Sequence, residues 1–353
     1  MMFDRLDRYI ARNVLMAMLV VQALLLGLDL VINYITDLED VEGSYGALQV
    51  FLYALMRLPW RFYQYAPVSV LIGALVGLGA MASSNELTVM RAAGRSLTRI
   101  LWGVMQPLVI VIVITMAVGE YAAPVTEQYA KSWRAELQQQ GGVADRGGGW
   151  QREGDNFYRF GSIRTDNTLI DMTRYRYDGK RLVSATHAAR AVRNEGHWQL
   201  QDVRTTRFKA DRTLTEQHAT QPWQTSLDPE LLRLIITDPD SQSISDLWRY
   251  AHYLGDQGLA ATDSWLYFWQ KLLLPLTLAS LLLVAASFVF GPLRTVAAGT
   301  RVFYGAIVGL SFKYIQDLLA PAATIFGFSP IWAILTPTLA SFALGFVLLR
   351  RAG

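Results

Sequence analysis

Long apolar segments dominate the pattern along the chain. Residues 62–85, 100–119 and 272–293 each lack Asp, Glu, Lys and Arg over at least 20 positions. About 20 apolar residues in a helix span the hydrocarbon core of a bilayer, so each run predicts a transmembrane helix. Residues 13–36 predict another, because Asp29 alone interrupts them.

The C-terminal part of the chain predicts two further helices. Val302–Ala320 is interrupted by only two charged residues, and the uncharged run 318–349 is too long for one span. Pro321 and the Gly327–Pro330 stretch indicate a turn within that run. The pattern therefore predicts six transmembrane helices.

Positive charge is unevenly distributed among the segments that join these helices. Two short loops, 37–46 after the first helix and 321–330 before the sixth, contain no Lys or Arg. Arginines precede the first helix, separate the second from the third, join the fourth to the fifth and follow the sixth: Arg5, Arg8, Arg12, Arg91, Arg95, Arg99, Arg294, Arg301, Arg350 and Arg351. Since short loops rich in Lys and Arg stay in the cytoplasm, we expect both termini there and residues 125–262 on the far side.

The segment 125–262 differs from the rest in composition. It holds 36 charged residues in 138, about 26%, against about 12% elsewhere. Asp178-Gly179 and Glu195-Gly196 are hairpin signals. Short segments of alternating polar and apolar residues surround them, at 157–163, 169–177, 182–186, 198–203 and 207–210. We predict a small β-sandwich or jelly roll.

The predicted fold is thus an α-helical membrane protein with six transmembrane helices and an inserted all-β domain. Residues 1–124 carry the first three helices and 263–353 carry the last three. Residues 125–262 form the β-jellyroll-like domain between them.

Whole-chain composition excludes several classes of function. Of 353 residues, 52% are hydrophobic and only 17% charged, which argues against a soluble enzyme. The chain has no cysteine, which excludes thiol chemistry and cysteine-ligated metals. A net charge of +3 gives no reason to expect nucleic acid. No nucleotide-binding or zinc-protease motif occurs, and the four histidines are scattered. We expect no catalytic residues, metal or cofactor in this chain, and an energy source in a partner or an ion gradient.

The segment between the second and third helices, SNELTVMRAAG (84–94), is the most informative one on the arginine-rich side. Its first residues can cap a short helix, Glu86 then lies near the positive end, and Gly94 ends it. Glu86, Met90 and Ala93 share one helical face. The residues alone leave two interpretations open: a simple connector, or a helix that docks in a groove of another protein.

Charged residues within the predicted spans are further candidates, because ionised groups there are costly and usually paired. Lys313 and Asp317 are four residues apart, where they form either a structural ion pair or a proton or ligand site. Glu120 and Lys271 lie near the outer ends of their helices, where long side chains can reach the interface. Arg61 either anchors its helix at the interface or recognises an anionic lipid headgroup.

Four runs resemble the lipopolysaccharide-export permeases of the LptF/LptG type, over essentially the whole chain. The last two of them point to the LptG branch. The runs are NELTVMRAAG (85–94), AVGEYAAP (117–124), DPDSQSISDLWRYAHYL (238–254) and FVFGPLR (288–294).

The resemblance implies a non-enzymatic permease subunit of an ATP-driven ABC transporter in a Gram-negative inner membrane. It implies a heterodimer with an LptF-like permease and two LptB-like ATPase subunits that bind ATP and Mg. LptC-like and LptA-like periplasmic proteins would then receive the lipopolysaccharide. It also implies that residues 84–94 couple the permease to the ATPase, through Ser84, Glu86, Leu87, Met90, Arg91 and Gly94.

One departure from the family concerns lysines near the outer end of the first helix, which would contact lipid phosphates. The matching stretch here has Asn33 and Tyr34, followed by Asp37, Glu39 and Asp40. We expect other basic residues to substitute for those lysines, namely Arg61, Lys131 or Arg134. Apolar residues of spans one, two and five are expected to line the lipid cavity: Leu26, Phe62, Phe303, Ile307 and Phe312.

Two functions from other classes stay open on the residues alone. The chain could be an ion-coupled secondary transporter that uses Lys313 and Asp317. It could also be a membrane-anchored structural or sensor protein with an extracytoplasmic β domain. Neither alternative accounts for the segment 84–94.

Overall fold

The chain forms two compact units. The first contains Met1–Asn33, Arg57–Pro124 and Ser243–Gly353, and the second contains Tyr34–Met56 and Val125–Gln242. The computed structural model describes residues 4–41, 44–139, 149–163, 168–194, 197–209, 211–225, 232, 234–235, 237–290 and 297–352.

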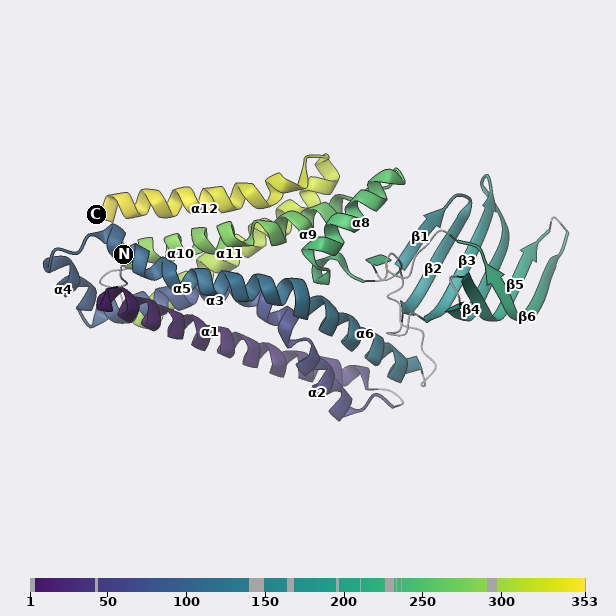
Figure 1. The fold of residues 1–353 in the computed structure, drawn as a ribbon, viewed down its shortest axis with the longest axis horizontal. Helices are drawn as coiled ribbons and strands as arrows, with labels where there is room; N and C mark the ends of the chain where they lie inside the picture. Colours follow the sequence, from purple (N-terminus) through teal and green to yellow (C-terminus); the bar gives the residue numbers. More distant parts are fainter. Residues whose placement is uncertain are drawn as a thin grey trace. The chain divides into compact units, whose positions relative to one another are not determined.

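The first unit is helical (Figure 1). The chain enters it through α1 (Arg5–Asp37), whose residues up to Asn33 belong to this unit. The other elements are α3 (Leu58–Ser83), α4 (Glu86–Ala92), α5 (Leu97–Ala117), the π-helix η2 (Val118–Ala122), α8 (Ile244–Asp256), α9 (Thr262–Leu272), α10 (Leu274–Phe290), α11 (Ala298–Phe326) and α12 (Pro330–Ala352).

Several of these helices can cross a membrane. In the described part of the chain, α1, α3, α5 with its continuation, and α12 are long and apolar enough, and α9 with α10 makes a fifth if the pair is one span. The helix α11, expected to be the fifth of six spans, is not among them. The count of six therefore stays a prediction.

A bend precedes the fourth predicted span. Helix α10 occupies most of the uncharged run 272–293, and α9, which comes before that run, meets it at 55°. Pro275 lies in the first turn of α10 and has no N–H for the carbonyl of Lys271. The helical ladder is therefore interrupted at Leu273.

Pro321, in contrast, does not end a helix. It lies inside α11, which continues to Phe326, and the turn before α12 begins at Gly327 with a φ of 69°. The prediction that Pro321 marks this turn is wrong. Apolar membrane helices tolerate an internal proline, whereas a glycine in the left-handed conformation ends a helix.

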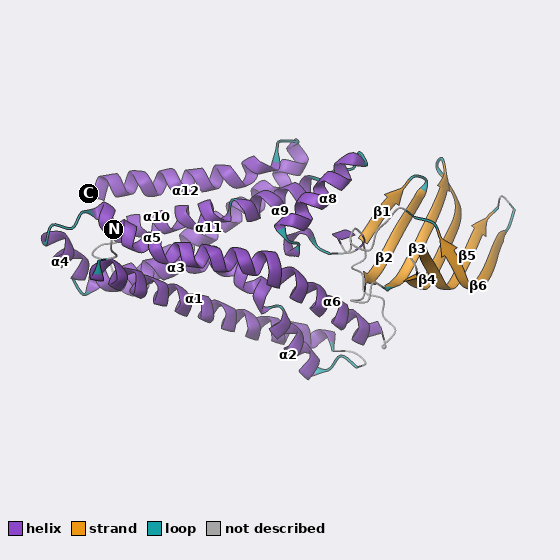
Figure 2. Ribbon diagram, viewed as in Figure 1, coloured by secondary structure: helices purple, strands orange, loops and turns teal. Residues whose placement is uncertain are grey.

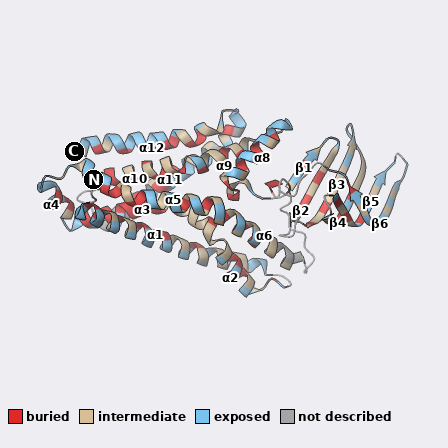
Figure 3. Cartoon of the chain, in the orientation of Figure 1, coloured by how far each residue is buried: buried red, intermediate tan, exposed pale blue. Residues whose placement is uncertain are grey.

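Helix α10 forms the centre of the helical unit. Buried positions make up 12 of its 17 residues, and it packs against α3, α5 and α12 (Figure 3). Helix α1 approaches α3 at two glycines: a Cβ on Gly73 would lie 2.5 Å from the Cα of Met18, and one on Gly77 would lie 3.0 Å from the Cα of Val14. This small-xxx-small spacing allows close backbone contact between membrane helices.

The second unit contains a six-stranded antiparallel sheet (Figure 2). Each strand pairs with the next along the chain, so the described strands form one sheet rather than the two of the predicted sandwich. The strands are β1 (Gly149–Glu153), β2 (Asn156–Ile163), β3 (Leu169–Asp178), β4 (Arg181–Asn194), β5 (His197–Phe208) and β6 (Thr213–Trp223).

The hairpin predicted at Asp178-Gly179 joins β3 to β4, with Gly179 at a φ of 58°. The second predicted hairpin, at 195–196, and the glycine-rich stretch 141–148 lie outside the described residues. Strand β6 was not predicted, because polar residues occupy nearly every position before Trp223. Strand β5 merges two predicted segments.

The alternation of buried and exposed side chains is interrupted at two positions of the sheet. Asp171 and Asp202 have positive φ values of 57° and 53°, and the pairing register is the same on both sides of each. Leu169 and Met172, on either side of Asp171, are both fully buried although they are three residues apart. A strict period of two therefore could not locate these positions from sequence.

The unit boundaries differ from those predicted. The second unit begins at Val125, as the predicted β domain does, but it ends at Gln242 rather than 262. It also includes Tyr34–Met56, with the 3₁₀ helix η1 (Leu38–Asp40), α2 (Ala47–Met56) and nearly all of α6 (Ala123–Gln139). Tyr45, Val50, Tyr53 and Ala130 pack together there, so residues distant in sequence form one small core.

Candidate functional site

The short helix α4 forms the segment predicted to couple to a partner. Two backbone positions with positive φ frame it: Asn85 at 62° and Gly94 at 87°. Leu87 and Met90 are buried in the core of the helical unit. Met90 was expected on a free docking face, but it contacts the chain's own core, because the apolar side of α4 turns toward α3. These two residues position α4, and its exposed surface comes from residues such as Val89, which is 65% exposed.

Glu86 lies in the first turn of α4. Its Oε1 accepts a hydrogen bond from the Ser84 hydroxyl at 2.9 Å. Its Oε2 is buried and has no hydrogen-bond partner among the described residues. A desolvated carboxylate oxygen without a donor is costly.

An ion cluster connects the end of α4 to α1. Asp7 on α1 is fully buried, and its carboxylate binds both Arg95 and, at 2.7 Å, Arg99. Arg95 also binds the exposed Asp4 at 2.9 Å. The hydrogen bond from Arg95 lowers the pKa of Asp4 below its ordinary value of 3.8. Burial opposes the charge of Arg95, yet the hydrogen bonds to Asp4 and Asp7 raise its pKa. Only Ala93 and Gly94 separate Arg95 from the end of α4, so this cluster ties α4 to the start of α1.

Arg61, expected to contact a lipid phosphate, is already paired. Its Nε lies 3.3 Å from Asp29, and its Nη2 donates to Asn33 at 3.0 Å. Tyr65 donates to the other oxygen of Asp29 at 2.6 Å. The guanidinium also lies over Trp60, 4.8 Å from the ring centroid. The side chain of Arg61 is only 17% exposed.

Lys131 and Arg134, the other two expected phosphate contacts, belong to α6 in the second unit and are also paired. Lys131 binds Asp238 and lies 3.5 Å from Glu127. Arg134 binds Asp40 at 2.7 Å and lies over the rings of two tyrosines. A lipid phosphate would therefore have to compete with carboxylates at all three positions.

The apolar residues predicted to line a lipid cavity fall into two groups. Phe303 and Ile307 are exposed on α11, at 62% and 44%, and Leu26 and Phe62 are half-buried. Phe312, however, is 7% exposed and lies in the core of the helical unit. It was expected to line the cavity, but it packs in the core. Its position on α11 places it on a different side of the helix from the exposed Phe303, Ile307 and Leu310.

Lys313 and Asp317 form the ion pair that their spacing predicts. The Lys313 Nζ lies 2.9 Å from the Asp317 carboxylate, and each side chain is about half exposed. The pair lies on α11 within one helical turn. Its exposure is that of a local surface pair rather than a buried site.

Glu120 has a role that its position in sequence did not indicate. It lies in η2, and its carboxylate accepts hydrogen bonds from the backbone N–H of Ile244 at 2.8 Å and from the Ser245 hydroxyl at 2.5 Å. These groups begin α8, where the Ser243 hydroxyl accepts from the Asp246 N–H at 3.0 Å. The Ser-x-x-Asp spacing predicts the start of α8, but no local signal links it to Glu120.

Comparison with known proteins identifies the family of a chain with these features. The family described as lipopolysaccharide export system permease LptF/LptG matches residues 8–351. The chain belongs to the LptF/LptG family. It is 33% identical to the lipopolysaccharide export system permease protein LptG of Escherichia coli K12, and 32% identical to that of Haemophilus influenzae Rd. Both alignments cover 99% of this chain and 99% of the relative.

Three of the four runs that resembled the LptF/LptG permeases lie at the contacts described above. Residues 85–94 are α4 and its ends, residues 117–124 contain η2, and residues 238–254 contain the start of α8. Glu120 and Ile244 join the second run to the third. The fourth run, 288–294, lies partly outside the described residues.

Proposed function

We propose that this chain is a permease subunit of an ATP-driven exporter that extracts lipopolysaccharide from the inner membrane. The observation that carries the proposal is the full-length match to LptG proteins, with 99% coverage on both sides. The proposed partners are an LptF-like permease, two LptB-like ATPases, and LptC-like and LptA-like periplasmic proteins. ATP and Mg bind the ATPase, and this chain uses no cofactor.

The proposed topology has six spans: α1, α3, α5, α9 with α10, α11 and α12. At 29 residues, α11 is long enough to cross a bilayer despite its ion pair. The distribution of arginines supports cytoplasmic termini and a periplasmic sheet. We propose that the sheet is part of a β-jellyroll. Among the described strands, β1 and β6 have a free edge, which is where such a fold would be completed.

The proposed contact with the ATPase is α4. Glu86 supports it, because its half-buried carboxylate accepts a described hydrogen bond from the Ser84 hydroxyl alone, and a cation from the partner would add a charge-assisted one. Leu87 and Met90 hold the helix on α3, while Ser84, Arg91 and Gly94 lie at its exposed ends. Motion of the ATPase dimer would then shift the permease between two states.

The lipid would contact exposed apolar residues of the helical unit. Leu24 and Leu28 on α1, and Phe303, Ile307 and Leu310 on α11, are at least 44% exposed. Acyl chains require such surfaces. A phosphate would reach Arg61 by displacing Asp29.

The experiment that tests the proposal is recovery of an ATPase with tagged full-length chain from mildly solubilised membranes. Wild type should retain an LptB-like ATPase, and Glu86→Ala should lose most of it, because a charge-assisted contact is removed. Glu39→Ala, which removes an exposed carboxylate from η1 in the second unit, is the control and should behave as wild type. Failure of wild type to retain any ATPase would contradict the proposed function.

A further inference from the structure

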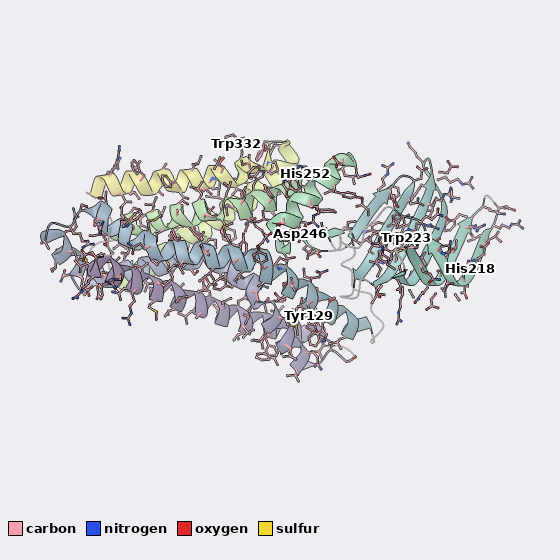
Figure 4. All side chains as sticks on the ribbon, viewed as in Figure 1. Tyr129, His218, Trp223, Asp246, His252 and Trp332 are labelled. Atoms are coloured by element: carbon pink, nitrogen blue, oxygen red, sulfur yellow. The ribbon has the colours of Figure 1, made fainter. Side chains whose placement is uncertain are left out.

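A cation-lined pocket lies on the six-stranded sheet. Its volume is about 490 Å³, which is within the usual range for small-molecule sites. Residues from β3, β4, β5 and β6 line it, among them Arg174, Arg176, Thr205, Arg207, Glu216 and His218. All belong to the second unit. Figure 4 labels His218 on β6.

The strand register explains why these side chains meet. Arg174 pairs with Thr186, which pairs with Thr205, which pairs with Glu216. Two rows further along, Arg176 pairs with Ser184, which pairs with Arg207. Side chains in one row, and in rows two residues apart, lie on one face of a sheet. The pocket is therefore built by the register of four strands rather than by a mobile loop.

The charge of the pocket is strongly positive. Three guanidinium groups line it, and among its described lining residues Glu216 is the one carboxylate. The Glu216 carboxylate lies 3.3 Å from Arg207 and 3.8 Å from His218, so these two residues share its negative charge. Like charges on neighbouring strands destabilise a sheet unless a counter-charge is present. Two arginines here have no carboxylate within the pocket.

Of the three arginines, Arg174 is the best placed to bind a ligand in the pocket. Its Nη2 donates only a long bond, 3.4 Å, to the Thr186 hydroxyl. Its Nε is buried and has no hydrogen-bond partner among the described residues. The buried Gln221 Oε1, also in the lining, likewise lacks one. An unsatisfied guanidinium that faces a pocket is suited to an oxyanion.

The neighbouring part of the same sheet face restricts the kind of ligand. Tyr158, Phe160, Met172 and Val203 continue the face and are at most 2% exposed. This apolar end is already filled by the chain itself, so it has no room for an acyl chain. The open, cationic end accepts a polar anionic group.

We propose that this pocket binds a phosphate group on a sugar or phosphate ester. Arginine forks match phosphate oxygens with two parallel hydrogen bonds, and Thr205 adds a hydroxyl. A phosphorylated lipid headgroup and a free phosphate share this chemistry. The assignment to a lipid headgroup rests on the proposed function, whereas the anion site itself rests only on the geometry of the sheet.

The test is modification of individual arginines in the full chain, purified with its partners, by a dicarbonyl reagent and mass spectrometry. The probes are inorganic pyrophosphate, lipopolysaccharide, and lipopolysaccharide from which the phosphates have been removed. At ten times its dissociation constant, a phosphate-bearing probe should slow modification of Arg176 and Arg207 about tenfold. Raising the salt concentration should weaken this protection.

Arg204 is the internal control. It lies on β5 three residues before Arg207, is exposed, and faces the other side of the sheet. Its modification rate should not change with any probe. Arg174→Gln should weaken the protection of Arg207 about threefold to tenfold, because a charge-assisted hydrogen bond to the ligand is lost.

The outcomes separate the alternatives. Protection by pyrophosphate and by intact lipopolysaccharide, but not by the dephosphorylated lipid, supports a headgroup site. Protection by pyrophosphate alone supports a site for free phosphate. Equal protection of Arg204 and Arg207, or protection of neither, overturns the proposal. If no ATPase accompanies the chain but Arg207 is still protected, the proposed function fails while the anion site stands.

Discussion

At the scale of single residues, carboxylates decide which cations are available. Asp29, Asp40 and Asp238 each neutralise a basic residue that was expected to contact lipid phosphate. Asp7 has a different effect, because it is fully buried and holds two arginines at once. A buried carboxylate with two cationic partners fixes geometry more strongly than an exposed pair, since removing it leaves both cations partly desolvated.

Asp7→Asn tests whether this cluster transmits motion from α4 to α1. The change should destabilise the protein by about 3 kcal/mol or more, because Arg95 loses its buried counter-charge. It should also lower the amount of lipopolysaccharide released per ATP hydrolysed by the assembled complex. Thermal unfolding in detergent and parallel transport and hydrolysis assays measure the two effects.

Asp4→Asn is the matched control, because Asp4 binds the same arginine but is 51% exposed. An exposed pair contributes little to stability, so this variant should remain close to wild type in both assays. Equal effects of the two substitutions would contradict the proposed role of Asp7.

At the scale of elements, two features position the helices: the Glu120 cap on α8 and the close contact of α1 with α3. The π-helix η2 directs Glu120 toward the start of α8, and Pro124 explains its location, because it has no N–H for the Glu120 carbonyl. Gly73 and Gly77 allow α1 to lie against α3. Each feature joins elements that are distant in sequence.

Glu120→Gln should loosen the first turn of α8. The amide keeps one acceptor but loses the negative charge that favours the helix N-terminus, at a cost of about 1 kcal/mol. Hydrogen exchange of the Ile244 and Ser245 amides should accelerate several-fold. Asp256→Asn, at the exposed C-terminal end of α8, is the control. Unchanged exchange in Glu120→Gln would show that the cap is not needed.

Gly73→Ala should separate α1 from α3. The added methyl would lie 2.5 Å from the Met18 backbone, which cannot move as a flexible side chain could. We expect a loss of about 1–3 kcal/mol in stability, measured as a lower melting temperature. Gly27→Ala on α1 is the control, because nothing lies within 4 Å of its added Cβ. A melting temperature for Gly73→Ala equal to that of the control would refute the close contact.

At the scale of the whole molecule, the chain combines a helical unit with a unit built on a β-sheet. The match to the LptF/LptG family covers residues 8–351 and therefore includes both units. The alternative of ion-coupled transport depended on Lys313 and Asp317. Because each is about half exposed and paired within one turn of α11, they have the environment of a local ion pair.

Asp317→Asn distinguishes ATP-driven export from ion-coupled transport. In an ATP-driven exporter, lipopolysaccharide release from vesicles should persist in this variant, since ATP hydrolysis in the partner rather than a charge on α11 drives the change of state. Removal of ATP should abolish release, and an uncoupler that collapses the ion gradient should have no effect. Release that depends on Asp317 and on the gradient, but not on ATP, would support the ion-coupled alternative instead.

The sequence by itself determined the features that depend on composition and local spacing. Apolar runs located most of the helices, because a membrane span must be predominantly apolar. The Asp178-Gly179 turn and the Lys313–Asp317 pair followed from contacts within four residues. The motifs of the family could also be recognised from the sequence, since each is a contiguous run of residues.

Only the tertiary structure decided the features that depend on contacts between distant residues. Met90 and Phe312 face the core rather than a partner or a lipid, and Arg61 is neutralised by Asp29 from another helix. The arginines of the sheet meet because four strands pair in a particular register. Periodicity gives the face of an isolated element, but the free energy of burial and ion pairing depends on which element packs opposite.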